Sequence, residues 1–249
     1  MRVRYLTLLF CLLITVYLLS QPRWLFTLIE KVWPGALYYV SGEYVSGESV
    51  LLASPKVALT IDDGPGPHTV EILALLNRYD AKATFFTISE HLPGYETIVA
   101  QVVESGHELG NHLTKDEPSI RLLPEAFEAD LLAAESALLP FVGEAGLRWL
   151  RPGMGVYTPE MVAIAQKHSY RLALGNNFPY DTHIPSSRFA RAFILNTVQP
   201  GDIIVLHDGQ GQNAARGDRT LKTLSVVLPK LRERGYKVTT LSELVASSK

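Results

Sequence analysis

Two adjacent carboxylates, Asp62 and Asp63, stand between an apolar run and the dipeptide Gly64-Pro65. Gly-Pro favours an abrupt turn, so we expect both carboxylates at the end of a β-strand. One carboxylate of such a pair can bind a metal ion, while the other faces the metal-bound water as a general base. The same residues also suit a solvated turn, so this motif alone does not separate a catalytic site from a plain strand end.

Three further segments carry groups of the same chemistry. His112 and Asp116 are four residues apart, which would bring both onto one face of a helical turn. An imidazole with carboxylates is a mixed nitrogen and oxygen ligand set that suits zinc or a similar divalent ion. Arg151 precedes a Pro-Gly turn and could orient a carboxylate through its bidentate fork. His207 ends an apolar run and titrates near neutrality, so it could protonate a leaving amine. Taken singly, Asp116 could instead cap a turn and His207 could be a hydrogen-bonded core histidine.

From Pro55 onward, short apolar and β-branched runs alternate with longer segments of helical period. We expect seven strands, at Val57–Ile61, Ala83–Ile88, His107–Gly110, Arg148–Arg151, Arg171–Gly175, Asp202–His207 and Tyr236–Thr240. We expect six helices between them, at Thr69–Tyr79, Tyr95–Ser105, Pro124–Leu139, Thr158–His168, Ser187–Val198 and Arg219–Arg234. This α/β alternation predicts a mostly parallel sheet, either a closed or partly closed barrel or an open doubly wound sheet. The candidate residues follow strands, and the carboxyl ends of parallel strands share one edge, so the candidates should converge there.

Residues 1–22 contain a run without charge from Tyr5 to Pro22. A helix over that run would span about 27 Å, close to the hydrocarbon thickness of a bilayer. Arg2 and Arg4 favour a cytoplasmic N-terminus, so we expect a single transmembrane helix and an extracytoplasmic catalytic domain. A cleaved signal peptide, which would give a secreted protein, is the alternative, although the residues before Gln21 make a poor cleavage site.

The rest of the chain divides into a connector at 23–54, with a short strand at Leu37–Val40, and a catalytic domain at 55–249. The formal net charge is −2 and no Lys/Arg run is present, which argues against a nucleic-acid partner. Cys11 is the only cysteine, so neither an intramolecular disulfide nor a cysteine-based zinc site can form. The oligomeric state stays open.

Taken together and in order, the motifs resemble those of the NodB-type polysaccharide deacetylases, carbohydrate esterase family 4, over roughly Pro55 to Leu244. Thr60–Pro65 resembles the family's Thr-Phe-Asp-Asp-Gly-Pro, and Gly106–His112 resembles its Gly-His-Glu-hydrophobic-Gly-Asn-His run. Arg151–Gly155 aligns with Arg-Pro-Pro-Tyr-Gly, and residues 206–208 match Leu-His-Asp. The resemblance implies a deformed (β/α)7 barrel that removes N-acetyl groups from an amino-sugar polymer with the help of a divalent metal ion.

The resemblance also implies a role for each matching residue. Asp62 would be the general base, oriented by Arg151, and His207 the general acid, tuned by Asp181. The backbone N–H of Met154 would contribute to an oxyanion hole. Leu206 would line the acetyl pocket, with Tyr180 as a second substrate-binding residue. The implied metal ligands are Asp63, His112 and Asp116, with zinc as the first choice and cobalt, nickel or manganese as alternatives.

Two positions depart from the family pattern. Asp116 stands where the family has its second metal-binding histidine, and Met154 stands where it has tyrosine. A second carboxylate makes the ligand set harder and more negative, so it could accept other divalent ions more readily. The departure at Asp116 keeps one alternative open, an inert membrane-tethered glycan-binding protein on the same fold. An O-acetyl esterase is a further alternative, because it needs the same machinery. Chitin fragments, peptidoglycan and other N-acetylglucosamine glycans all fit as acetylated substrates.

Overall fold

A computed structural model describes residues 15, 17–41, 54–143 and 146–247, which belong to two compact units, 1–34 and 35–249. In the first unit, helix α2 (Arg23–Val32) lies within the segment expected to be a connector. Trp24, Leu28 and Val32 recur every four residues along α2 and are exposed. No helix of the described residues is long and apolar enough to cross a bilayer. Most of the predicted membrane-spanning run lies outside the described residues.

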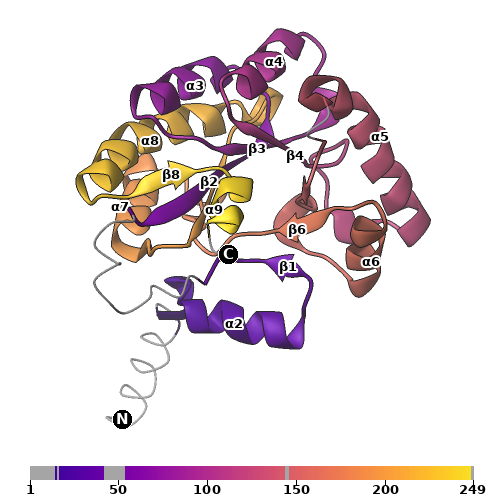
Figure 1. Cartoon of the computed structure of the whole chain (residues 1–249), viewed down its shortest axis with the longest axis horizontal. Helices are drawn as coiled ribbons and strands as arrows, with labels where there is room; N and C mark the ends of the chain where they lie inside the picture. Colours follow the sequence, from indigo (N-terminus) through magenta and orange to yellow (C-terminus); the bar gives the residue numbers. More distant parts are fainter. Residues whose placement is uncertain (1–14, 16, 42–53, 144–145, 248–249) are drawn as a thin grey trace, which may run out of the picture. The chain divides into compact units, whose positions relative to one another are not determined.

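The second unit is a parallel sheet surrounded by helices (Figure 1). Its strands are β1 (Ala36–Leu37), β2 (Lys56–Gly64), β3 (Thr84–Thr87), β4 (Glu108–Asn111), β5 (Trp149–Leu150), β6 (Arg171–Ala173), β7 (Ile203–His207) and β8 (Lys237–Thr239). Its α-helices are α3 (Thr69–Arg78), α4 (Glu96–Glu104), α5 (Pro124–Val142), α6 (Pro159–Lys167), α7 (Ser187–Thr197), α8 (Ala215–Glu233) and α9 (Leu241–Ala246). Every expected strand and helix of this unit is present, with its ends shifted by a few residues. Helix α9 has no counterpart among the expected elements.

The sheet has the order β1-β6-β5-β4-β3-β2-β7, with β8 beside the first residues of β2. All strand pairs in this order are parallel. The sheet curls until its two ends approach, because isolated bridges join Asn177 to Ile204 and Tyr39 to Asp202. The structure therefore confirms a partly closed parallel barrel rather than an open doubly wound sheet.

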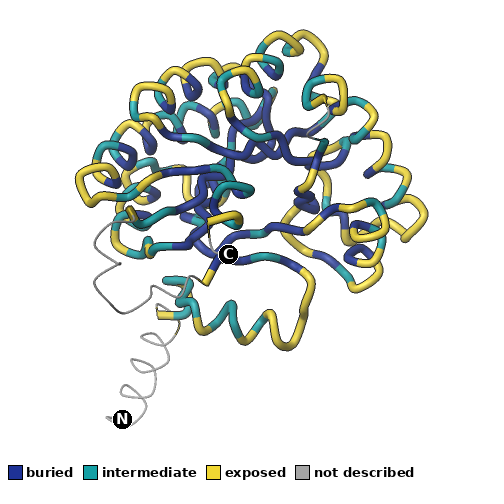
Figure 2. Tube along the Cα trace, in the orientation of Figure 1, coloured by how far each residue is buried: buried dark blue, intermediate teal, exposed yellow. Residues whose placement is uncertain are grey.

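An apolar cluster inside the barrel includes Ala58, Phe86 and Trp149. Leu241 and Leu244 of α9 belong to this cluster, so the last helix packs against the barrel interior. Figure 2 shows buried strands at the centre and helices that are exposed on their outer faces. Helix α9 lies at the start of β3, where the backbone N–H of Leu241 donates to Thr84. The carboxyl ends of the strands remain for polar side chains.

Candidate active site

The candidate acid and base meet at the carboxyl ends of two neighbouring strands, β2 and β7. Asp62 on β2 pairs in register with His207 on the neighbouring parallel strand β7. The Oδ2 atom of Asp62 lies 3.9 Å from Nε2 of His207. This separation leaves the carboxylate and the imidazole facing each other without a direct hydrogen bond. The convergence predicted for residues far apart in the sequence is therefore present at this edge.

A bulge in β2 brings the second carboxylate to the same site. The register between β2 and β3 shifts between Asp62 and Gly64, and Asp63 has a left-handed backbone with φ of 65°. Successive side chains of a regular strand point to opposite faces, so without the bulge the two carboxylates would diverge. The carbonyl oxygen of Asp63 is 2.9 Å from Nδ1 of His91, a hydrogen bond that helps to hold the bulge.

Asp62 is fixed by a buried arginine. Nη1 of Arg151 donates to Oδ1 of Asp62 at 2.5 Å and to Oγ1 of Thr60 at 2.8 Å. Nε of Arg151 donates to the carbonyl oxygen of Ala173 at 2.7 Å, and the guanidinium lies 4.1 Å from the ring centre of Phe86. These contacts hold the guanidinium in one orientation, so Arg151 can orient and neutralise the carboxylate as the resemblance implied.

The imidazole of His207 is fixed by Asp181. Nδ1 of His207 lies 3.0 Å from Oδ1 of Asp181, and the backbone N–H of His207 donates to Oδ2 of the same carboxylate at 3.0 Å. Burial alone would lower the pKa of His207, but the charge and hydrogen bond of Asp181, together with the charges of Asp63 and Asp62, outweigh it and raise that pKa to about 9. His207 is therefore protonated at neutral pH, with Nε2 turned toward Asp62, which is the state a general acid needs.

Asp63 and His112 have the geometry of two ligands for one divalent ion. Oδ1 of Asp63 lies 3.3 Å from Nε2 of His112, and Nδ1 of His112 donates to the carbonyl oxygen of Arg151 at 2.6 Å. That second hydrogen bond orients the ring as is usual for a metal-binding histidine. Burial favours the neutral form of Asp63, but the hydrogen bond from His112 and nearby positive charges hold its pKa well below the ordinary range. This pair of side chains therefore suits a metal ion.

Asp116 does not complete that ligand set. Residues 112–118 form no helical turn, so the spacing of four does not bring Asp116 beside His112. Its Oδ2 instead accepts a hydrogen bond from Asn213 at 3.0 Å and lies 3.6 Å from Nη1 of Arg216. The described part of the chain contains no group of three or more His, Cys, Asp or Glu side chains that could hold a metal ion. The implied three-ligand site is therefore not assembled.

Arg216 is the site residue that the sequence analysis missed. It lies in the first turn of α8, and its Nη1 donates to Oδ2 of Asp63 at 2.5 Å. The only signal in the sequence was its position in the segment that follows β7, where loops reach the catalytic edge. An arginine that starts a surface helix is ordinarily solvated, so its residue type did not single it out.

The remaining predicted site residues are Met154, Tyr180 and Leu206, and they differ in how they lie relative to His207. Met154 has a left-handed backbone, with φ of 62°, in the short helix Gly153–Gly155 after β5, and its side chain is 66% exposed. The ring of Tyr180 packs against Phe178, whose own ring lies 5.7 Å from that of His207. Leu206 is fully buried and adjacent to His207 on β7, so the strand alternation turns it to the opposite face. This geometry does not support Leu206 as the lining of an acetyl pocket, and Val205 shares the face of His207 instead.

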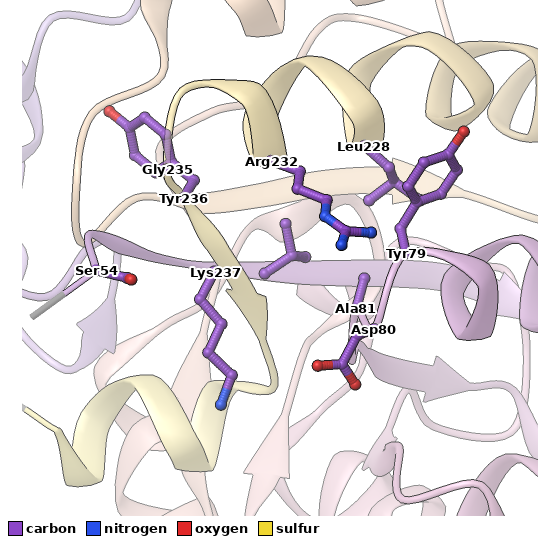
Figure 3. A pocket seen from close by; sticks show the side chains of 10 residues that line it. Ser54, Tyr79, Asp80, Ala81, Leu228, Arg232, Gly235, Tyr236 and Lys237 are labelled. Carbon is purple, nitrogen blue, oxygen red and sulfur yellow. The ribbon is translucent and has the colours of Figure 1, made fainter.

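A separate pocket lies at the other edge of the sheet. Its volume is about 340 Å³, and its lining includes Asp80 after α3, Arg232 near the end of α8 and Lys237 at the start of β8 (Figure 3). Helices end and strands begin at this edge in a parallel βα arrangement, so the pocket is remote from Asp62 and His207. It contributes nothing to the candidate active site.

Comparisons with known proteins agree with the order of the motifs and with the fold. The sequence profile of the family described as polysaccharide deacetylase matches residues 52–173. The peptidoglycan-N-acetylglucosamine deacetylase of Bacillus cereus is 31% identical over 210 residues, which cover 83% of this chain and 93% of that protein. A chitooligosaccharide deacetylase of Bradyrhizobium sp. is 29% identical over 197 residues, which cover 76% of this chain and 90% of that protein.

The solved structure of a pseudoenzyme of carbohydrate esterase family 4 from Bacillus anthracis is also similar. It is 22% identical and has a TM-score of 0.72, over 85% of this chain and 69% of that one. That likeness shows a common fold. Together with the matching profile and the relative at 31% identity, it leads to one conclusion: the chain belongs to the polysaccharide deacetylase family.

Proposed function

We propose that this chain hydrolyses N-acetyl groups on an amino-sugar polymer, with Asp62 as general base and His207 as general acid. The observation that carries the proposal is the distance of 3.9 Å between Oδ2 of Asp62 and Nε2 of His207. Each group has its own charged partner, Arg151 for the base and Asp181 for the acid. The names of the relatives, which act on peptidoglycan and chitooligosaccharides, support glycans of N-acetylglucosamine as substrates.

The proposed reaction needs two proton transfers on opposite sides of the acetyl carbon. Asp62 removes a proton from the attacking water, and Arg151 keeps the carboxylate turned toward that water. The backbone N–H of Met154 is the proposed donor to the oxyanion. His207 then gives its proton to the nitrogen of the leaving amine, and Asp181 stabilises the imidazolium until that moment. Acetate and a free amine are the products.

A metal ion is the second part of the proposal. A divalent ion held by Asp63 and His112 would polarise the acetyl carbonyl and lower the pKa of its bound water. Zinc is the first candidate, with cobalt, nickel or manganese as alternatives, because imidazole and carboxylate ligands suit all of them. The hydrogen bond from Nδ1 of His112 to the carbonyl oxygen of Arg151 supports Nε2 as the ligand atom.

A glycan-binding protein without turnover is the second candidate function. It is favoured by one observation, the ion pair between Arg216 and Asp63 in the place where an ion would bind. The variant Asp62→Asn separates the two candidates, because a hydrolase loses turnover and keeps substrate binding, whereas a pure binder shows no turnover in either form.

Acetate release from a panel of acetylated glycans tests the proposal. The full chain in detergent would be assayed with penta-N-acetylchitopentaose, peptidoglycan and O-acetylated xylan, each with added zinc and with a chelator. Release from the N-acetylated glycans that the chelator abolishes is expected. Release from the xylan alone would identify an O-acetyl esterase, and no release from any substrate in the presence of zinc would refute the hydrolase.

The proposed location is a membrane, with the N-terminus in the cytoplasm and the catalytic unit outside. The uncharged run from Tyr5 to Pro22 and the two preceding arginines support it. Exposed Trp24, Leu28 and Val32 on one side of α2 would suit the membrane surface. Protease digestion of intact cells should remove the catalytic unit, while a signal peptide would leave the protein in the medium.

A further inference from the structure

Each of the two adjacent carboxylates has an arginine of its own, but the two arginines are held very differently. Arg151, which pairs with Asp62, is 3% exposed and is also fixed by Thr60, by the carbonyl oxygen of Ala173 and by the ring of Phe86. The side chain of Arg216, which pairs with Asp63, is 19% exposed. Its contacts within the described residues are with the carboxylates of Asp63 and Asp116. Arg151 is therefore locked in place, whereas Arg216 is held by charge.

Arg216 competes for the atoms that a divalent ion would need. Oδ1 of Asp63 faces Nε2 of His112 at 3.3 Å, and Oδ2 of Asp63 accepts from Nη1 of Arg216 at 2.5 Å. Both oxygens of this buried carboxylate are thus engaged. The same Nη1 atom lies 3.6 Å from Oδ2 of Asp116, so one guanidinium neutralises both carboxylates. An ion could bind Asp63 and Asp116 together only after this guanidinium had moved.

The backbone under Arg216 is fixed, so the movement would be one of the side chain. A Cβ atom on the next residue, Gly217, would lie 2.3 Å from Oδ1 of Asp208 and 3.0 Å from Cβ of His68. The first turn of α8 is therefore clamped against the loop that follows β2. The long side chain of Arg216 can still change rotamer toward solvent, because it is partly exposed and its carboxylate partners lie at its tip.

We infer that Arg216 is a latch on the metal-binding edge of the site. With no divalent ion present, its guanidinium neutralises Asp63 and Asp116; when an ion binds, Arg216 leaves Asp63, and Asp116 becomes available as the third ligand. The inference rests on the proposed function, because the ion concerned is the one proposed for catalysis. It also explains why an aspartate at position 116 suits this chain: a carboxylate pairs with Arg216 in the latched state, which an imidazolium would not do.

Zinc affinity tests the latch without reference to turnover. Zinc would be titrated calorimetrically into the full chain in detergent, into Arg216→Gln and into Lys222→Gln, which removes a charge from an exposed ion pair on the same helix. Arg216→Gln should bind zinc about tenfold more tightly or better, because a charge-assisted hydrogen bond no longer competes. Lys222→Gln should match the wild type. Adding Asp116→Asn to Arg216→Gln should reverse part of the gain.

Equal zinc affinities of the wild type and Arg216→Gln within twofold would overturn the latch, and so would weaker binding by the variant. A second measurement needs no variant: phenylglyoxal should modify Arg216 of the wild type severalfold faster with zinc than without, as counted by peptide mass spectrometry. Unchanged labelling would also overturn it.

Acetate release separates the latch from the proposed function. If zinc affinities follow the expectation but no form releases acetate, the function fails and the latch stands. If the wild type releases acetate while the zinc affinities of the wild type and Arg216→Gln are equal, the proposed function stands and the latch fails.

Discussion

The replacement Asp181→Asn removes the charge that keeps His207 protonated while leaving an amide of the same shape. Asp181 contacts His207 twice, at Nδ1 and at the backbone N–H, each at 3.0 Å. It is the largest influence that raises the pKa of His207 to about 9, against an ordinary value of 6.5. The difference corresponds to about 3 kcal/mol in favour of the imidazolium. Burial of His207 persists in the variant and opposes the charged form, while the charges of Asp63 and Asp62 still favour it, so its pKa should fall toward the ordinary 6.5.

The lower pKa of His207 in Asp181→Asn should shift the alkaline limb of the pH–rate profile to lower pH. At pH 8 about nine-tenths of the wild-type imidazole is protonated, against about one thirtieth for a pKa of 6.5, so kcat/KM should fall by up to about thirtyfold. The ratio between wild type and Asp181→Asn should shrink as the pH falls toward 5, because both forms then carry the proton. Acetate release between pH 5 and pH 10 measures both profiles. The control is Asp218→Asn, which removes a carboxylate from an exposed ion pair with Lys222.

Two results would refute this reasoning. A limb that stays near pH 9 in Asp181→Asn would mean that Asp181 does not set the protonation of His207. A loss of the same size at every pH would mean that Asp181 acts on structure rather than on the proton, and circular dichroism of the variant would then be expected to differ from that of the wild type.

The other predictions concern the base, the core and stability. Asp62→Asn should lower kcat by about 10²- to 10⁴-fold, and full activity in a kinetic assay would contradict the base role. The same variant should lower the free energy of unfolding by about 3–5 kcal/mol, as measured by urea unfolding, because it leaves Arg151 buried without its counter-charge. Phe86→Ala should destabilise the fold by about 3–5 kcal/mol, since its ring is fully buried in the barrel; a loss under 1 kcal/mol in urea unfolding would contradict its place in the core. Because His207 has a raised pKa in the folded state, its contribution to stability is complete below pH 6.5 and is lost as the pH rises through about 9. Urea unfolding should show this decline in the wild type, and a similar decline in Asp181→Asn would contradict its cause.

The fold could be predicted largely from local pattern. The run Val57–Ile61 and the six later strand candidates are short, apolar and rich in β-branched residues, and helical segments separate them. Each of them forms a strand near its expected place. Helix α9 was not predicted, because six residues are too few to show a helical period. Its place is set by packing of Leu241 and Leu244 inside the barrel, which depends on residues far away in the sequence.

The candidate site was predictable where a residue directly ends a strand. Asp62 and His207 do so, and their strands are neighbours in register. The spacing of His112 and Asp116 suggested a helical turn, but the segment is irregular, and Asp116 instead faces α8. Strand alternation alone argues against Leu206 beside His207, a point that the family resemblance obscured.

Other features of the site had no local signal. The bulge at Asp63 follows from how β2 meets β3, and it decides that both carboxylates reach the same place. The partner of Asp63, Arg216, is 153 residues away in the sequence and reaches it only because β7 and α8 fold back beside β2. Long-range side-chain pairs of this kind depend on the assembled barrel and on rotamers rather than on spacing.

The proposed reaction adds water across an acetamide at the edge formed by β2 and β7. Incubating the zinc-supplemented full chain with penta-N-acetylchitopentaose in water enriched in ¹⁸O, and analysing the acetate by mass spectrometry, measures this directly. Acetate with one ¹⁸O atom is expected from the wild type, and almost none from Asp62→Asn. Unchanged oligosaccharide with the wild type, or equal labelled acetate from both forms, would contradict the proposed reaction.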